Sequence, residues 1–225
     1  MSTPATRRVL VLAVSALTCG CGESNRTGSS PTIPSGPPAA PPVVAAVSPD
    51  HGPTWRYTAV DVRGSGFQRG ATVMFDGATS FGRFVDSGRM EVRTPMRPVG
   101  MLDVMVTNPD GQRAALAAAY TFEAVPRPTL TPSANTVIPG AQLSISWQTS
   151  APGTLDWIAL FSVATATNDE HASFWWDYTD GSASGILKLT APPQPGQYEF
   201  RYLPDDQYTA VTRSSVVTVS GAGSQ

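Results

Sequence analysis

The sequence predicts an all-β protein made of two β-sandwiches in tandem, preceded by a signal peptide and a disordered tether. From residue 43 onward, short alternating runs of apolar and polar residues are separated by turn residues, as in half-buried strands. The chain holds 21 prolines and 20 glycines in 225 residues, which suits many turns and one low-complexity segment. We therefore divide the chain into residues 1–20, 21–42, 43–124 and 129–220.

The first twenty residues have the pattern of an export signal. Arg7 and Arg8 form a short basic region, and the apolar run over residues 9–17 is too short to cross a bilayer as a helix. The run then continues as Leu-Thr-Cys-Gly-Cys over residues 17–21. This segment resembles the bacterial lipobox, in which a small residue precedes the cysteine that becomes lipidated.

The resemblance implies that Cys21 is the lipidated N-terminus of the mature chain. Gly22 follows it, and in the lipoprotein sorting pattern a residue other than Asp implies the outer membrane. The alternative is an ordinary signal peptide, cleaved nearby, with Cys19 and Cys21 incidental. Because the sequence has only these two cysteines, we expect no disulfide, and the folded part must rely on hydrophobic packing.

Residues 23–42 consist mainly of Ser, Thr, Gly, Pro and Ala, with almost nothing to bury. Such a composition favours disorder or polyproline II structure. We expect this segment to act as a tether between the lipid and the first folded module.

The first predicted module begins at Val43. Within residues 58–63, Val60 and Val62 alternate with charged residues, which predicts a strand with one wet face. Asp-Gly at residues 76–77 and Asn-Pro-Asp-Gly at residues 108–111 are strong turn signals between strands.

These landmarks resemble the IPT/TIG family of immunoglobulin-like domains, and the resemblance covers residues 43–122. The segment Trp-Arg-Tyr at residues 55–57 departs from the family pattern, which commonly has glycine before the second strand. The matching pieces are Val47-Ser48-Pro49, Gly52-Pro53, residues 60–67, residues 70–73 and residues 104–111.

A second module follows the short linker Pro-Arg-Pro at residues 126–128. Residues 143–147 alternate cleanly, whereas residues 156–161 form a nearly continuous apolar run suited to a central strand. Residues 196–202 place three aromatic side chains on one face, as in a strand that faces a core.

Immunoglobulin sandwiches often carry a tryptophan on their third strand and a tyrosine whose hydroxyl fixes the corner before the sixth. Trp157 and Tyr198 suit these two roles, with Phe200 in the place of a core cysteine. The stretch is also similar to SKICH-like immunoglobulin domains and to fibronectin-like modules of secreted bacterial proteins. We carry over no partner and no binding residue from that similarity.

The sequence gives no pattern of catalytic or cofactor-binding residues, and we expect no enzyme, cofactor or metal. The two histidines, His51 and His171, lack zinc-site spacing, and the run Gly-Ser-Ala-Ser-Gly has Ala183 where a nucleophile elbow requires serine. The acidic loops at residues 168–171 and 205–206, with Asp177 and Asp180, are interpreted as solvated charges, with calcium binding as the alternative. A net charge of −2 without a basic block argues against nucleic acid.

The aromatic run at residues 174–178 is the main candidate for a binding surface. On a strand, Trp175 points to one side, and Trp176 and Tyr178 point to the other. Exposed aromatic side chains stack on sugars or anchor protein partners, whereas buried ones contribute to a core. We favour the interpretation that this run packs in the core. Coplanar exposed rings would distinguish a sugar platform from a core.

These observations lead to a functional hypothesis. We expect a non-catalytic, envelope-anchored outer-membrane lipoprotein that acts as a surface binding, adhesion or spacer module. Its expected partners are the membrane, through the lipid anchor, and a protein or glycan ligand. The alternatives are a carbohydrate-binding protein, an accessory module of a secreted hydrolase system, and a hydrolase with an unrecognised site.

Overall fold

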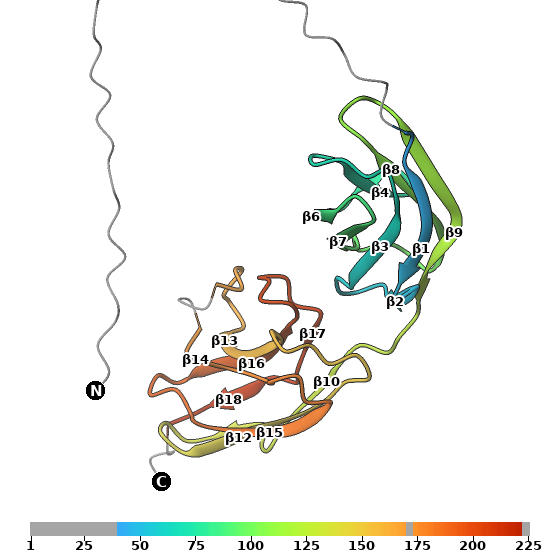
Figure 1. The fold of residues 1–225 in the computed structure, drawn as a ribbon. Helices are drawn as coiled ribbons and strands as arrows, with labels where there is room; N and C mark the ends of the chain where they lie inside the picture. Colours follow the sequence, from blue (N-terminus) through green and yellow to red (C-terminus); the bar gives the residue numbers. More distant parts are fainter. Residues whose placement is uncertain (1–39, 170–172, 222–225) are drawn as a thin grey trace, which may run out of the picture. The chain divides into compact units, whose positions relative to one another are not determined.

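The computed structural model describes residues 40–169 and 173–221, and these residues form strands and turns without a helix (Figure 1). The predicted all-β fold is confirmed. No helix of the described residues is long and apolar enough to cross a membrane. The predicted signal peptide, Cys21 and nearly all of the predicted tether lie outside the described residues.

Strands β1 to β9 form the first module, which consists of two sheets. In the notation of immunoglobulin sandwiches, the first sheet has the order A-B-E-D and the second has the order A′-G-F-C-C′. The first sheet contains β1 (Val43–Ser48), β3 (Ala59–Ser65), β7 (Arg89–Arg93) and β6 (Phe81–Asp86). The second contains β2 (His51–Pro53), β9 (Arg113–Glu123), β8 (Gly100–Thr107), β4 (Thr72–Phe75) and β5 (Ala78–Thr79).

The core of the first module lies between these sheets and follows the predicted alternation. Val60 and Val62 of β3 are buried in it, while Asp61 and Arg63 point away. The predicted two-residue turn between β4 and β5 is also confirmed: Asp76 and Gly77 both have positive φ, as a tight hairpin with the right twist requires.

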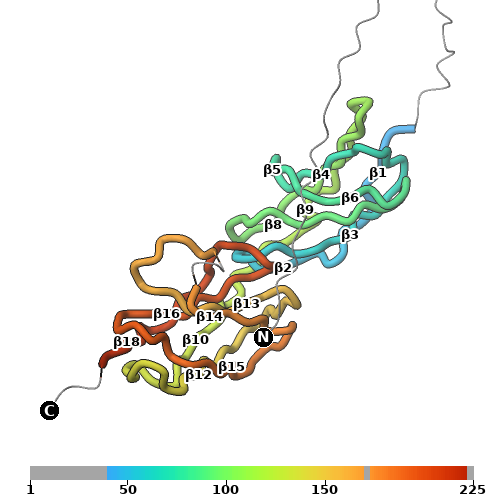
Figure 2. The backbone as a smooth tube through the Cα atoms, turned by 90° about the vertical axis from the view of Figure 1, so that its left-hand side faces the viewer, coloured from blue at the N-terminus to red at the C-terminus, as the bar shows by residue number. Residues whose placement is uncertain are grey.

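Strands β10 to β18 form the second module, again from two sheets, and Figure 2 shows β12 and β15 on the side opposite β13, β14 and β16. The smaller sheet contains β10 (Thr129–Pro132), β12 (Gln142–Gln148) and β15 (Ser184–Thr190). The larger sheet contains β11 (Thr136–Val137), β18 (Val217–Val219), β16 (Gly196–Leu203), β13 (Trp157–Ser162) and β14 (Trp175–Tyr178), with β17 (Thr212–Arg213) paired to β16.

Strand β13 is buried on both faces, which explains its continuous apolar run. Ile158 and Leu160 enter the core between the two sheets. Trp157 and Phe161 point to the opposite face, where they form a separate small cluster with Leu203. The second module therefore buries apolar side chains on both sides of its larger sheet.

The predicted tyrosine corner is present, and Trp157 is a buried residue of a central strand as predicted, but it faces away from the core between the sheets. The hydroxyl of Tyr198 donates a hydrogen bond of 2.9 Å to the backbone oxygen of Gln194, and Phe200 is fully buried beside it in sequence. Trp157 is buried, but on the outer face of its sheet. The tryptophan in the core between the sheets is Trp147 of β12.

Candidate functional site

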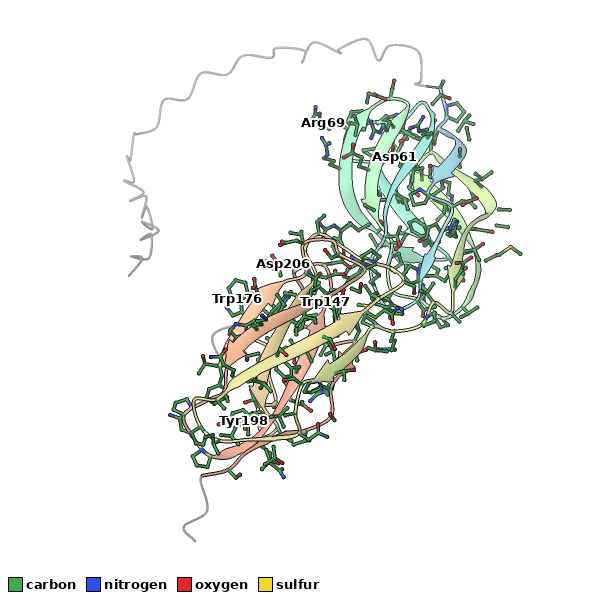
Figure 3. All side chains as sticks on the ribbon, turned by 90° about the horizontal axis from the view of Figure 1, so that it is seen from below. Asp61, Arg69, Trp147, Trp176, Tyr198 and Asp206 are labelled. Carbon is green, nitrogen blue, oxygen red and sulfur yellow. The ribbon has the colours of Figure 1, made fainter. Side chains whose placement is uncertain are left out.

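A small pocket with aromatic walls lies on the outer face of β13 and β14. It has a volume of about 190 Å³ and is called the aromatic pocket below. Figure 3 shows two of its residues, Trp176 and Asp206, side by side, with Tyr198 toward the other end of the module. The lining residues come from β13, from β14 and from the loop after β16: Trp157, Trp176, Tyr178, Asp206 and Tyr208.

Strand pairing brings the first three of these side chains together. In the antiparallel ladder of β13 and β14, Trp157 lies opposite Tyr178, and Ala159 lies opposite Trp176. Directly opposed residues place their side chains on the same face of a sheet, so all four share the outer face. Trp175 therefore points to the other face, where its ring centroid lies 6.4 Å from that of Phe200.

The rings of the aromatic pocket meet at nearly right angles. Trp157, only 3% exposed, has its ring centroid 6.2 Å from that of Trp176 and 6.1 Å from that of Tyr208, with interplanar angles of 80° and 81°. Trp176 and Tyr178 are 5.5 Å apart at 87°. The rings therefore line a small pocket at steep angles to one another. They do not form the coplanar platform that a stacked sugar would require.

Trp157 also carries an unpaired polar atom. Its indole Nε1 is buried and has no hydrogen-bond partner among the described residues. A buried indole N–H normally finds an acceptor, so an unpaired one in the residue at the base of a pocket is a feature of a site that a ligand can complete.

One carboxylate completes the lining of the pocket. The hydroxyl of Tyr178 donates a hydrogen bond of 3.0 Å to Oδ1 of Asp206, and the backbone N–H of Asp206 donates to the oxygen of Leu155 over 2.8 Å. Asp206 has no ion pair within the described residues, and its φ of 57° lies in the left-handed region that aspartate tolerates better than most residues.

The adjacent residue, Asp205, is fixed by the first module. Both modules belong to the one compact unit Ala39–Gln225. The guanidinium of Arg56 contacts the Asp205 carboxylate, and the backbone N–H of Tyr57 donates to the same carboxylate over 3.2 Å. Burial raises the pKa of Asp205, and the charge of Arg56 opposes this shift. The loop that presents Asp206 is thus held at a neighbouring residue.

A second carboxylate, Asp156, lies deeper under the same loop. It is fully buried and accepts hydrogen bonds from Arg56 over 3.0 Å, from the hydroxyl of Tyr202 over 2.7 Å and from the backbone of Asp205 over 3.1 Å. Burial, together with the hydrogen bond to Asp156, raises the pKa of Tyr202. Asp156 therefore acts as the centre of a hydrogen-bonded network that holds the loop.

The structure separates the three aromatic residues singled out from the sequence. Trp176 and Tyr178 line the aromatic pocket, while Trp175 packs against the core between the sheets. Sequence reasoning missed Trp157 and Tyr208 as lining residues. The tyrosine belongs to a loop beyond the next two strands, and no local pattern links it to Trp176.

The acidic loops do not converge on a metal site in the described part of the chain, which contains no group of three metal-ligating side chains. The interpretation of residues 205–206 as solvated charges is wrong for Asp205, which is half-buried and paired with Arg56. Glu170 and His171 lie outside the described residues.

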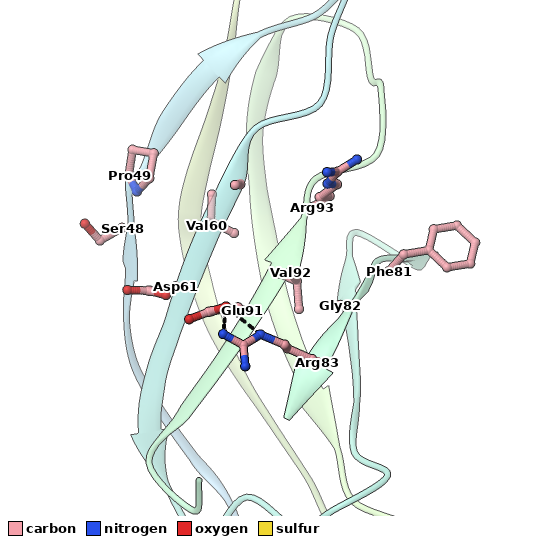
Figure 4. Close-up of a pocket in the computed structure, with 11 residues that line it drawn as sticks. Ser48, Pro49, Val60, Asp61, Phe81, Gly82, Arg83, Glu91, Val92 and Arg93 are labelled. Atoms are coloured by element: carbon pink, nitrogen blue, oxygen red, sulfur yellow. Dashed lines mark hydrogen bonds and ion pairs between the residues drawn. The ribbon is translucent and has the colours of Figure 1, made fainter. Parts of the chain in front are cut away.

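A larger hollow of about 800 Å³ lies on the outer face of the first sheet of the first module (Figure 4). It is an open stretch of sheet surface on which Arg83 contacts Glu91 over 2.7 Å. Phe81 is 82% exposed at its edge and points away from the sheet in Figure 4. This open hollow is a weaker candidate than the aromatic pocket, whose lining includes the buried and unpaired Nε1 of Trp157.

Comparison with known families identifies the first module. Residues 42–124 match the model of the IPT/TIG domain. The first module is therefore similar to IPT/TIG domains over nearly its whole length. The match covers less than half of the chain and does not include the second module, which carries the aromatic pocket. A search of curated proteins finds no match.

The solved structures to which the chain is similar include three that match it at low identity. The γ-CGTase of alkalophilic Bacillus clarkii is 16% identical, with 82% of this chain and 26% of that chain covered and a TM-score of 0.33. The fibronectin(III)-like modules of Clostridium thermocellum CbhA are 12% identical, with 78% and 94% covered and a TM-score of 0.29. Bacteroides ovatus SGBP-B, solved with a mixed-linkage heptasaccharide, is 16% identical, with 82% and 46% covered and a TM-score of 0.31.

Proposed function

We propose that the protein is a non-catalytic, envelope-anchored lipoprotein that presents a ligand-binding immunoglobulin-like module at the outer membrane. The observation that carries this proposal is the aromatic pocket: exposed rings stand around a buried tryptophan whose N–H has no partner in the described chain. Aromatic side chains combined with a few placed polar groups are a common feature of ligand-binding sites.

The sequence of the first 21 residues supports anchoring. A basic region, a short apolar run and Gly20 before Cys21 are what an exported lipoprotein requires. Two or more acyl chains on one cysteine would be enough for stable attachment to a bilayer. The proline-rich residues 23–42 would then hold the IPT/TIG domain and the second module away from the lipid.

The composition of the pocket supports binding without catalysis. Among the described residues that line it, Asp206 is the single carboxylate, and none is histidine, cysteine or serine. Glycoside hydrolysis uses two carboxylates on opposite sides of a bond, and nucleophilic catalysis needs a nucleophile beside a base. The lining therefore lacks the pairs of groups on which these reactions depend.

Carbohydrate binding, alone or as an accessory module of a secreted hydrolase system, is the second candidate. Trp176 favours it, because 43% of this residue is exposed at the pocket. An exposed indole stacks on a sugar face in many binding sites.

Anchoring and binding are tested separately. For anchoring, the native protein should fractionate with the outer membrane, mass spectrometry should find acylated Cys21, and Cys21→Ala should release the chain. A soluble native chain that begins elsewhere would overturn this part of the proposal.

For binding, the full mature chain is screened against a glycan array and a panel of charged small molecules, with tryptophan fluorescence as a second readout. At least one ligand should saturate the wild type and lose affinity with Trp176→Ala. Ile186→Ala, a change at a 65% exposed side chain on the opposite sheet, serves as the matched control and should have no effect. The binding function would be contradicted if no ligand of either set binds.

A further inference from the structure

We infer that the aromatic pocket binds a small organic cation, specifically a quaternary or methylated ammonium group. This inference rests on the proposed binding function and names the ligand class of the same site. It is carried by three properties of the pocket: the arrangement of its rings, its charge and its size.

The rings are arranged as the walls of a cage. A cation is attracted to the face of an aromatic ring when it lies within about 6 Å of the ring centroid. Adjacent centroids in the pocket are 5.5 to 6.2 Å apart, and neighbouring rings are nearly perpendicular. One alkylated ammonium group held among Trp157, Trp176 and Tyr208 can therefore contact more than one ring. Recognition by several aromatic walls is a known way of binding such groups.

The charge of the lining also favours a cation. Asp206 is the only charged side chain among the described residues that line the pocket, and none of these residues is lysine or arginine. Asp206 has no ion pair within the described part of the chain, where its carboxylate accepts the hydrogen bond that Tyr178 donates. An anionic ligand would meet Asp206 as a like charge, whereas an ammonium group would be attracted to it.

Size and ring geometry argue against a saccharide as the primary ligand. The volume of about 190 Å³ is below the range of about 300 to 1,000 Å³ that is common for sites enclosing drug-sized ligands. It is nonetheless far more than one water molecule needs. A compact charged headgroup fits these limits better than a sugar chain, which needs an open ring face.

The loop that carries Asp206 is held in place before any ligand arrives. Asp205 is bound by Arg56, and the backbone N–H of Asp206 is bound by Leu155. Such preorganisation reduces the entropy lost on binding. The carboxylate is therefore presented at the pocket in the free protein.

The test uses the full mature chain with Cys21→Ser, which keeps it free of lipid. Choline is titrated and binding is followed by tryptophan fluorescence and by calorimetry. The matched control ligand is dimethylbutanol, the neutral isostere in which carbon replaces the nitrogen of choline. We expect saturable choline binding and at least tenfold weaker binding of the isostere.

Variants locate the ligand within the protein. Trp176→Ala and Tyr208→Ala should each weaken choline binding by about 2- to 30-fold, the range of a single cation–π contact. Asp206→Asn should weaken it and reduce its dependence on ionic strength. Ile186→Ala should leave it unchanged.

Three outcomes would overturn the inference: no saturable choline binding, equal binding of the isostere, or choline binding that these three pocket variants leave unchanged. If choline fails while a saccharide binds in a Trp176-dependent way, the cation inference falls and the binding function stands. If neither binds, both fall.

Discussion

Arg56 of the first module and Asp156 of the second module form an ion pair of 3.0 Å in which both side chains are almost completely buried. Arg56 also donates a hydrogen bond of 2.6 Å to the backbone oxygen of Ala151. Arg56 is the middle residue of the Trp-Arg-Tyr segment where the sequence departs from the IPT/TIG pattern. The departure is explained by these contacts, because the segment provides part of the surface between the modules.

Trp55 has a related role. It is 3% exposed and belongs to the buried cluster of the second module, and its indole donates to the backbone oxygen of Val125 over 3.0 Å. The sequence predicted two sandwiches in tandem, at residues 43–124 and 129–220, and independent folding of each of them stays a prediction. We now expect the isolated second module to be less stable than the same module in the full chain, since it would lose both Trp55 and Arg56.

Arg56→Ala should destabilise the second module by about 3 to 5 kcal/mol, because it leaves the buried Asp156 carboxylate without its cationic partner. The matched control is Arg83→Ala, which removes an exposed ion pair and should cost less than about 1 kcal/mol. Denaturant melts followed by tryptophan fluorescence measure both, since four of the five tryptophans lie in the second module. Similar losses for the two variants would contradict a structural role for the Arg56–Asp156 pair.

The raised pKa of Asp205 predicts how stability depends on pH. Burial makes the folded chain hold the Asp205 proton more tightly than the unfolded chain does. The stability that this residue contributes is therefore fully present below pH 3.8, the ordinary pKa of the group, and it is lost as the pH rises through the pKa of Asp205 in the folded chain. The unfolding free energy of the wild type should therefore fall relative to that of Asp205→Asn as pH rises above 3.8. Arg56→Ala should raise the pKa of Asp205 further, which carboxyl NMR titration can detect. If the difference in unfolding free energy between the wild type and Asp205→Asn does not change with pH, the predicted direction of the pKa shift is contradicted.

Tyr198→Phe tests the tyrosine corner. The substitution keeps the ring, which packs in the core, and removes only the hydrogen bond to Gln194. We expect a loss of about 0.5 to 1.5 kcal/mol in the unfolding free energy, the usual contribution of one hydrogen bond. An unchanged denaturation midpoint would show that the hydroxyl is equally well satisfied by water.

The features predicted correctly from the sequence are those set by neighbouring residues. The alternation around Val60 fixed the face of β3, the Asp76-Gly77 pair fixed a hairpin, and the spacing of Tyr198 and Phe200 placed the tyrosine corner. The face occupied by Trp157 could not be predicted, because a strand buried on both sides shows no alternation.

The candidate site needed the tertiary structure for the same reason. Tyr208 contacts Trp157 only because its loop folds back over the outer face of the larger sheet. The sequence of residues 174–178 does not predict this contact. The partner of Arg56 is likewise 100 residues away along the chain. Periodicity reports which side of a strand is buried, but it does not report which distant loop covers that side.

The last prediction contrasts the two tryptophans of the aromatic pocket. Trp157 is 3% exposed and Trp176 is 43% exposed, although their rings are neighbours. Trp157→Ala removes a large side chain from the cluster on the outer face of β13 and should cost about 3 to 5 kcal/mol. Trp176→Ala removes a partly exposed ring and should cost less than about 1 kcal/mol, while it weakens ligand binding. Denaturant melts of the full mature chain measure both values under identical conditions. A mild effect of Trp157→Ala would contradict its burial. An equally large loss of stability with Trp176→Ala would mean that Trp176 contributes to the folded core and is not an exposed residue available for ligand binding.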